Sequence, residues 1–384
     1  MRVLVAPDKF RGTLSASDAA QAIAVGWRRG DRGAEVEEVP MADGGEGTLD
    51  AMVAALGGER RRLTVSGPLG DPTPAEYGVV AGTDGPMAVV EMARASGLAL
   101  MSPARRDPMR ATTRGTGELI LDACRRGGRR VLVCIGGSAT NDAGAGMAQA
   151  VGIRLLDERG DDLRPGGAAL RHLARVDMRG LDPAVASAEF VVASDVDNPL
   201  VGPRGASAVY GPQKGATPEQ VRGLDDALRH FAAVVYRDLA VDVRDLPGAG
   251  AAGGLGAGLI AFLGARLRPG VEVVMDAVRL RERLDGANLA VTGEGSFDEQ
   301  SLHGKVPAGV LHAAEEHRVP AVILCGTAIA AVPGVRVFSL VDRFGADTAN
   351  ERARWALEEL SAEVSVLLQR ERREAEEAER ARQL

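Results

Sequence analysis

Short apolar runs that stop abruptly at glycine-rich loops dominate this sequence. Residues 2–7, 130–135 and 289–292 have the length and composition of buried strands in a parallel sheet. Each run stops at a loop that combines glycines with acidic or hydroxyl residues, and segments with helical spacing separate the runs. This alternation of strand and helix predicts an α/β protein with parallel sheets.

The middle of the chain follows a different pattern. Residues 63–65 and 77–80 have the composition of short strands, and turns rich in Gly, Pro and Asp separate them, which indicates hairpins. At 384 residues the chain also exceeds the length at which single cores usually stop growing. We therefore expect two domains: a discontinuous parallel-sheet domain of residues 1–65 and 285–384, interrupted by a mixed α/β domain of residues 66–284.

Three other segments carry specific expectations. Residues 218–236 have the spacing of an amphipathic helix. Residues 248–258 have the composition of a glycine-rich link. The alternating acidic and basic residues of 351–384 predict a solvated terminal helix, with partner binding as the weaker alternative.

Charge and composition exclude several classes of protein. A formal net charge of −7 without a basic stripe gives no electrostatic footprint for nucleic acid. No apolar run reaches the roughly 18 to 20 residues that cross a bilayer, and no cleavage site follows the N-terminus. Cys124, Cys134 and Cys325 are far apart and form no CxxC pair, as expected for buried thiols in a reducing compartment. We expect a cytoplasmic protein that binds neither nucleic acid nor membranes.

Lysine is rare, and its positions are informative. Of 46 basic residues only Lys9, Lys214 and Lys305 are lysines, and each lies in or beside a glycine-containing loop. An ammonium group is a compact point charge suited to phosphate. Drift toward arginine in a GC-rich genome is the alternative explanation, but the shared loop position favours a function on anions.

The loop 136–146 is the strongest candidate for cradling nucleotide phosphates. Glycines let a backbone approach a phosphate closely, and successive N–H groups can form an anion-binding nest. A plain turn is the alternative, but this loop is longer and richer in polar side chains than a turn requires. The residues assigned to the nucleotide are Gly136, Gly137, Ser138, Thr140, Asn141, Gly144, Gly146 and Lys214.

Acidic residues follow several of the predicted strands. A single loop carboxylate is commonly a turn former or helix cap. As a set, these residues suit Mg²⁺, which takes one or two carboxylates together with phosphate oxygens and water. A further carboxylate could accept a proton from an attacking hydroxyl. The residues assigned to the metal are Asp195, Asp197, Glu294 and Asp298.

The familiar nucleotide motifs are incomplete or absent. Gly-x-Gly occurs seven times, and at Gly45, Gly115, Gly144, Gly254 and Gly293 the third position after the second glycine does not complete the dinucleotide-binding fingerprint. Residues 248–253 have the spacing Gly-x-Gly-x-x-Gly, but no predicted strand leads directly into them, as the fingerprint requires. There is no Walker A sequence either, so a P-loop kinase or protein kinase is excluded as a simple interpretation. A hydroxy-acid oxidoreductase is correspondingly weakened.

Five segments together resemble the type I glycerate kinases: residues 6–15, 40–48, 136–146, 193–200 and 292–298. They occur in order and span nearly the whole chain. The resemblance implies a flavodoxin-like or Rossmann-like domain interrupted by a second α/β domain, with the active site in the cleft between them. It also implies an enzyme that uses ATP and Mg²⁺ to phosphorylate D-glycerate to 2-phosphoglycerate.

The resemblance and the loop chemistry together give the remaining assignments. Lys9, Asp195 and Lys305 are expected to act in catalysis. Substrate binding is assigned to Asp8, Asp43, Gly44, Gly45, Glu46 and Ser296. Formation of 3-phosphoglycerate, a hydroxy-acid oxidoreductase and a non-catalytic sugar-acid sensor remain as alternatives. The expected partners are small molecules, and a homodimer is left open.

Overall fold

A computed structural model describes residues 1–82, 85–302 and 304–383. The chain divides into two compact units. The first unit contains Met1–Asp43, Asp50–Leu56 and Val271–Leu384, and the second contains Gly44–Leu49 and Gly57–Gly270. The expected boundaries, near 65 and 285, lie further along the chain than the ends of the segment Gly57–Gly270. At the first boundary the reason is that β3 (Gly58–Ser66) already belongs to the second unit's sheet.

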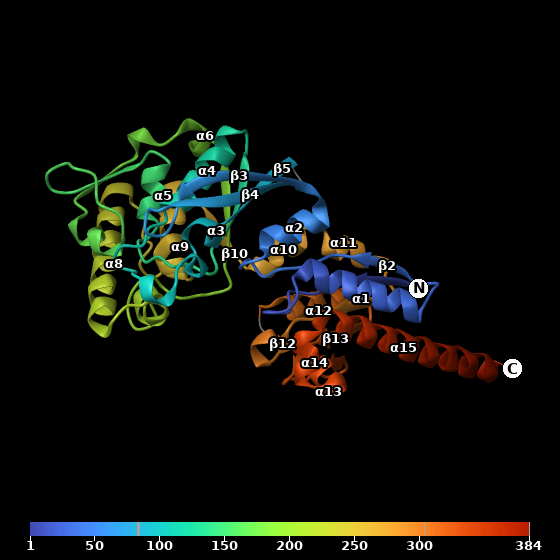
Figure 1. The fold of residues 1–384 in the computed structure, drawn as a ribbon. Helices are drawn as coiled ribbons and strands as arrows, with labels where there is room; N and C mark the ends of the chain where they lie inside the picture. The colour runs from blue at the N-terminus through green and yellow to red at the C-terminus, as the bar shows by residue number, and fades with distance from the viewer. Residues whose placement is uncertain (83–84, 303, 384) are drawn as a thin grey trace. The chain divides into compact units, whose positions relative to one another are not determined.

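The first unit is built on a five-stranded sheet in which every pair is parallel (Figure 1). Its spatial order is β15-β13-β11-β1-β2, and numbered along the chain within this sheet the order is 2-1-3-4-5, as in flavodoxin. The predicted α/β class with parallel sheets is confirmed. The strands are β1 (Arg2–Val5), β2 (Glu35–Glu38), β11 (Leu289–Thr292), β13 (Ala321–Cys325) and β15 (Arg336–Ser339).

Helices α1 (Ala16–Gly30) and α15 (Ala353–Gln383) pack closely against each other in this unit. Ser15 caps α1 by accepting the N–H of Asp18. Gly26 makes the close approach possible, because a Cβ there would collide with the backbone carbonyl of Glu358. Ser361 Oγ then donates to the carbonyl of Ile23 at 2.6 Å.

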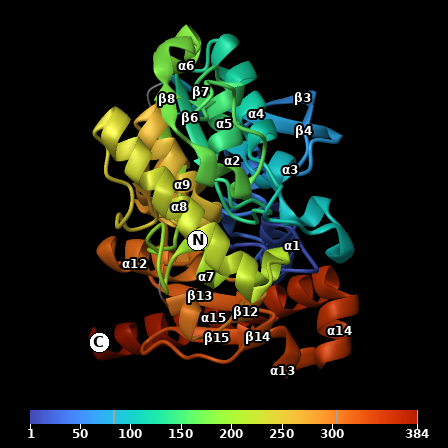
Figure 2. The ribbon, with the colours of Figure 1, turned by 90° about the vertical axis from the view of Figure 1, so that its left-hand side faces the viewer.

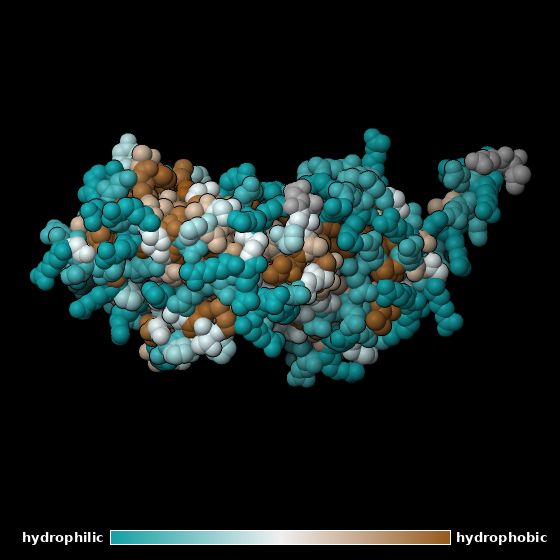
Figure 3. Space-filling view, turned by 90° about the horizontal axis from the view of Figure 1, so that it is seen from above, coloured by the Kyte–Doolittle hydropathy of each residue, from teal (hydrophilic) through white to brown (hydrophobic). Residues whose placement is uncertain are grey.

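The expectation that the terminal helix is solvated is therefore wrong for its first half. Ala356, Leu357, Leu360 and Val364 are buried in the core with β1, β11 and α1. Residues 370–382 are exposed, and this part of α15 extends away from the body of its unit (Figure 1). It is also hydrophilic on the face shown in Figure 3.

The remaining elements of the first unit surround this sheet. Its helical segments are α2 (Thr48–Leu56), α10 (Gly270–Ala277), α11 (Leu280–Leu284), η6 (Glu299–Leu302), α12 (Val306–Glu316), α13 (Leu340–Phe344) and α14 (Ala346–Glu351). A small parallel pair joins β12 (Ser296–Phe297) to β14 (Thr327–Ala328).

The second unit contains a six-stranded mixed sheet in the order β10-β9-β6-β5-β4-β3. The predicted hairpin is present: β3 pairs antiparallel with β4, and β4 with β5, whereas the other pairs are parallel. Helix α4 (Arg114–Arg125) packs along the hairpin and lies beside α5 (Ala145–Ala150) (Figure 2). The further strands are β4 (Pro72–Gly82), β5 (Gly85–Glu91), β6 (Arg130–Cys134), β9 (Glu189–Ala193) and β10 (Arg266–Arg268).

The other elements of this unit are short, apart from α8. The helical ones are α3 (Ala93–Ser96), η1 (Leu98–Leu100), η2 (Pro103–Arg105), η3 (Gly167–His172), η4 (Met178–Gly180), α6 (Pro183–Ala186), α7 (Ala206–Tyr210), η5 (Pro212–Lys214) and α8 (Pro218–Leu239). β7 (Arg154–Leu156) and β8 (Arg175–Asp177) form a separate antiparallel pair. The amphipathic helix predicted at 218–236 is confirmed as α8, which a capping box at Thr217 begins.

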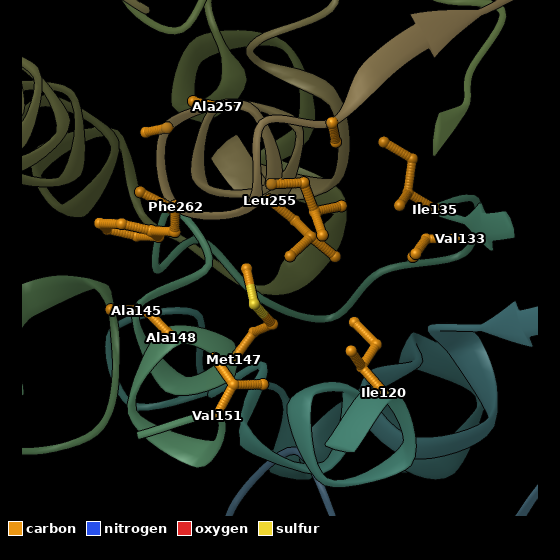
Figure 4. Close-up of a cluster of buried hydrophobic side chains, with 14 of the residues drawn as sticks. Ile120, Val133, Ile135, Ala145, Met147, Ala148, Val151, Leu255, Ala257 and Phe262 are labelled. Atoms are coloured by element: carbon orange, nitrogen blue, oxygen red, sulfur yellow. The ribbon is translucent and has the colours of Figure 1, made fainter. Parts of the chain in front are cut away.

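The glycine-rich segment 248–258 is not a link but enters helix α9 (Ala251–Leu263). Ala252, Gly253 and Gly254 adopt left-handed geometry inside it. The glycines are needed for packing, since a Cβ at Gly253 or Gly258 would collide with the carbonyls of the loop 140–143. Figure 4 shows Leu255 of α9 and Met147 of α5 pointing toward one another in the core.

No helix in the described part of the chain is long and apolar enough to cross a membrane.

Two leucines on α15 test the packing of that helix. Leu357→Ala removes a fully buried side chain and should lower the free energy of unfolding by about 2–5 kcal/mol. Leu367→Ala is the matched control, because Leu367 is 39% exposed and should change stability by less than about 0.5 kcal/mol. Urea denaturation of both variants gives the comparison. Equal, small effects would show that α15 is not part of the core.

Candidate active site

The first unit places acidic and basic residues where the strand order reverses. The strand order reverses between the neighbours β1 and β11, and open α/β sheets bind ligands at such a point. Asp8 and Lys9 follow β1, and Glu294 follows β11. The Asp8 N–H donates to the carbonyl of Gly293 at 2.8 Å, so the two loops are tied together.

Two carboxyl groups at this point are buried. The Asp8 side chain accepts the N–H of Lys9 at 2.7 Å, and the residue is only 4% exposed. Burial raises the pKa of Asp8 to about 7; the negative charge of Asp43 adds to the rise, and Lys9 opposes it. Burial also raises the pKa of Glu294. Glu294 Oε1 has no hydrogen-bond partner among the described residues, so this oxygen can accept a donor or bind a cation.

Two lysines lie beside carboxylates of the same unit. Lys9 Nζ is 3.7 Å from Asp43, and Lys305 Nζ is 3.8 Å from Asp298. Asp298 is held in place by Ser301, whose N–H and hydroxyl both donate to it. The structure thus brings the catalytic candidate Lys9 together with Asp8 and Asp43, which were assigned to the substrate. It brings the catalytic candidate Lys305 together with Asp298, which was assigned to the metal. Ser296 lies on β12, and its carbonyl accepts the Ser301 hydroxyl at 3.3 Å.

The second unit gathers its glycine loops at the carboxyl ends of parallel strands. The loop after β6 begins with Gly136 and Gly137, which lie against Gly45 and Glu46: a Cβ at Gly136 would be 2.9 Å from the Gly45 Cα, and one at Gly137 would collide with the Glu46 carboxylate. Gly44 adopts φ +82 and packs against Ala193 at the end of β9. The assigned substrate segment 44–46 and the assigned phosphate loop are therefore neighbours.

The second half of the phosphate loop is closed on its own carboxylate. Asp142 is fully buried and accepts hydrogen bonds from the N–H and hydroxyl of Thr113 and from the N–H groups of Gly144 and Gly146. Burial raises the pKa of Asp142, and these hydrogen bonds oppose the rise. The amides of Gly144 and Gly146 are thus engaged by Asp142, which differs from the open phosphate cradle expected from the sequence.

Lys214 lies inside the protein and not on the surface of the loop. It is 1% exposed, and its Nζ donates to Ser138 Oγ and to the carbonyl of Thr140, both at 2.7 Å. Burial lowers the pKa of Lys214 to about 7, and the negative charge of Asp142 opposes that change. The ammonium group fixes the shape of the loop at 138–140.

Thr140 and Asn141 are also buried. Asn141 Nδ2 donates to Ser207 Oγ at 3.0 Å. Asn141 Oδ1 and Thr140 Oγ1 have no hydrogen-bond partner in the described part of the chain. Both side chains, which were assigned to the nucleotide, are therefore buried within the second unit.

The four carboxylates assigned to a metal divide between the units. Asp195 Oδ1 accepts the N–H of Gly270 at 2.7 Å, and Asp197 forms an exposed ion pair with Arg204 at 3.0 Å. Glu294 and Asp298 belong to the first unit. Within residues 1–82, 85–302 and 304–383 no group of three or more His, Cys, Asp or Glu side chains is placed to hold a metal ion.

Sequence reasoning missed Glu91, a buried carboxylate that supports the site loops. It accepts the N–H of Leu49 at 2.7 Å, in the first turn of α2, and the Nε of Arg94 at 2.9 Å. Glu91 is 3% exposed. The available signal was an acidic residue directly at the end of the apolar run 87–90.

Known proteins with similar sequences are glycerate kinases. The sequence model of the glycerate kinase family matches residues 3–369. A glycerate kinase from Halalkalibacterium halodurans is 47% identical over 372 residues, which cover 95% of this chain and 97% of the relative. A glycerate 2-kinase from Escherichia coli is 49% identical over 327 residues, or 85% of each chain.

The fold has a solved counterpart. The crystal structure of a protein from Salmonella typhimurium LT2, described as a candidate glycerate kinase 2, matches with a TM-score of 0.88 and 44% sequence identity. The match covers 97% of this chain and 99% of that one. On the sequence and fold together, the chain belongs to the glycerate kinase family, whose named members are phosphotransferases.

Proposed function

We propose that this chain transfers the γ-phosphoryl group of ATP to D-glycerate and that the product is 2-phosphoglycerate. Membership of the glycerate kinase family supports the kinase activity. The name of the Escherichia coli relative, glycerate 2-kinase, supports the 2-phosphate over the 3-phosphate.

The observation that carries the proposal is the pairing of lysines with carboxylates at the strand-order reversal of the first unit. Lys9 and Lys305 lie 3.7–3.8 Å from their carboxylates, and both side chains remain partly exposed. Phosphoryl transfer depends mainly on positioning and on stabilising charge at the phosphoryl oxygens. Two ammonium groups in this position suit the carboxylate of glycerate and the transferred phosphoryl group.

Asp8 is the best candidate for the base that accepts the proton of the attacking hydroxyl. A general base works best when its pKa lies near the working pH, and the pKa of Asp8 is raised to about 7. Asp195, the carboxylate first assigned to catalysis, accepts the N–H of Gly270 and is exposed. We propose that Asp195 shapes its loop and that Asp43, Glu46 and Ser296 bind substrate hydroxyls.

We propose that the phosphates of ATP bind at residues 136–138, with Lys214 holding this part of the loop from inside. The unpartnered Oε1 of Glu294 fits a Mg²⁺ ligand, and Glu294 and Asp298 would hold the ion. Bound there, Mg²⁺ would neutralise negative charge on the phosphates. Asp197 is a weaker ligand because Arg204 already pairs with it.

A cytoplasmic location belongs to the same proposal. Cys124, Cys134 and Cys325 are all free and buried, which suits a reducing compartment.

Turnover should require all three expected reactants. ADP release should depend on D-glycerate and on a divalent cation, and phosphorus NMR of the product should give the signal of 2-phosphoglycerate. Full activity in excess chelator would contradict the role of the metal, and a 3-phosphoglycerate signal would contradict the regiochemistry.

Lys9 and Lys305 should matter for rate, and Lys214 for stability as well. Lys→Met at 9 or 305 should lower kcat on the order of 100-fold, because a preorganised charge is lost from the reacting centre. These partly exposed residues should change the free energy of unfolding by less than about 0.5 kcal/mol. Lys214→Met leaves the Thr140 carbonyl without its donor and should destabilise by about 1–3 kcal/mol.

Steady-state kinetics and melting temperatures of the three variants make this comparison. Lys→Arg at 9 and 305 retains the charge and tests whether the compact ammonium is needed. If Lys→Met at both sites keeps kcat/KM within about threefold of the parent, the catalytic assignment is wrong.

Asp8→Asn should show a pH-dependent gain in stability together with a loss of activity. The folded-state pKa of about 7 exceeds the unfolded value of about 3.9, so the folded protein holds a proton that the unfolded chain has released. This carboxyl therefore lowers stability increasingly as the pH rises through this window, and its penalty is complete above about pH 7. Asparagine cannot ionise, so the melting temperature should exceed the parent's at pH 8 and match it near pH 4.

Activity of Asp8→Asn should fall on the order of 100-fold if Asp8 is the base. Glu315→Gln, at an exposed site on α12, is the control and should give no pH-dependent difference. A melting-temperature difference that is the same at both pH values would contradict the assigned burial of the Asp8 charge.

A further inference from the structure

A pocket in the second unit lies apart from the residues assigned to the reactants. Its volume is about 520 Å³, within the range of small-molecule sites. The β3–β4 hairpin forms one wall, and the segment that follows β5 forms the other. It is lined by Arg62, Leu63, Thr64, Pro74, Ala75, Glu76, Arg94 and Leu100.

The lining combines apolar walls with fixed planar charged groups. Pro74 and Leu100 supply apolar side chains on the face of Glu76, and Leu100 is 42% exposed. The Leu63 and Ala75 side chains point to the core on the other face of the hairpin. Glu76 accepts hydrogen bonds from Arg62 at 3.0 Å and from Arg94 at 2.8 Å, which orients both guanidinium groups.

The charged groups around the pocket are paired with one another. Glu76 also accepts from Arg60 at 2.8 Å, and Arg94 also pairs with the buried Glu91, so three arginines stand against two carboxylates. Because carboxylates already engage these guanidinium groups, the lining favours a flat polar ring over a small anion. Guanidinium planes stack on aromatic faces, and the Glu76 carboxylate can accept from an amino group.

The wall of the pocket is joined directly to the phosphate loop. The N–H of Leu98 donates to the carbonyl of Gly137 at 2.8 Å, and the N–H of Ala139 donates to that of Ser96 at 3.0 Å. Gly97 and Ser138 form an antiparallel bridge between these bonds. Leu100 follows on the same segment, so the pocket begins next to residues 136–138.

We infer that this pocket holds the base and ribose of ATP, with the phosphates extending to the loop at 136–138. The inference rests on the proposed kinase function and adds the nucleoside subsite to it. The apolar residues would contact the faces of the base, and Glu76 would favour the amino group of adenine over the carbonyl of guanine.

Direct binding measurements can separate the base from the phosphates. Isothermal titration with ATP and with tripolyphosphate, which lacks base and ribose, should be run on the parent and on two variants. Thr64→Trp fills the pocket from an exposed position on β3, and Leu100→Ala removes an apolar wall. Leu246→Ala is the matched control, because Leu246 is 40% exposed in the same unit but does not line the pocket.

Both pocket variants should weaken ATP binding roughly 10-fold and leave tripolyphosphate binding unchanged, while Leu246→Ala changes neither. Equal weakening of both ligands would mean that the substitutions act through the phosphate loop, and this would overturn the inference. Unchanged ATP binding in both variants would overturn it as well.

Glycerate turnover by the parent, measured alongside, reports on the proposed function separately. A parent that binds ATP in a pocket-dependent way but does not phosphorylate glycerate would overturn the proposed activity and support the nucleoside subsite. A parent that phosphorylates glycerate, with ATP binding insensitive to Thr64→Trp, would support the proposed activity and overturn the nucleoside subsite. A parent that binds no ATP overturns both.

Discussion

The parallel pairing of β1 with both β2 and β11 is the constraint on which the first unit depends. Val3 lies opposite Val36 on one side and Leu289 on the other, so a strand from the start of the chain is fixed between a near neighbour and a distant one. The whole second sheet is inserted between β2 and β11. Because parallel strands end at the same edge, Asp8 and Glu294 come together although 286 positions separate them in the sequence.

The two units treat buried charge differently. In the second unit, Asp142 receives four hydrogen bonds and Lys214 donates two, so the buried charges are satisfied within the loop and give it a fixed shape. In the first unit, the raised pKa of Asp8 and the unpartnered oxygen of Glu294 indicate carboxyl groups that the fold does not fully satisfy. Such groups reduce stability, and they are typical of functional sites.

Local signals in the sequence predicted which segments form strands and helices. They did not predict which segments pack against one another or which groups form hydrogen bonds. Apolar runs predicted the buried strands, and the amphipathic spacing of residues 218–236 predicted α8, because strand burial and helical periodicity depend on neighbouring residues. The composition of 248–258 predicted a glycine-rich link, but those glycines permit close contact with the loop 140–143, which only the folded chain shows. The sequence likewise could not predict that the Gly144 and Gly146 amides donate to Asp142, because this depends on where the Asp142 side chain points in the folded loop.

The central claim is that the loops at the carboxyl ends of the two sheets bind the reactants. Hydrogen exchange with mass spectrometry, with and without ATP, Mg²⁺ and D-glycerate, tests it most directly, because bound ligands protect the amides that they cover or order. Protection should concentrate at residues 6–15 and 292–305 in the first unit and at 94–101 and 134–146 in the second. Protection confined to segments outside these loops, with the four regions unchanged, would contradict the claim.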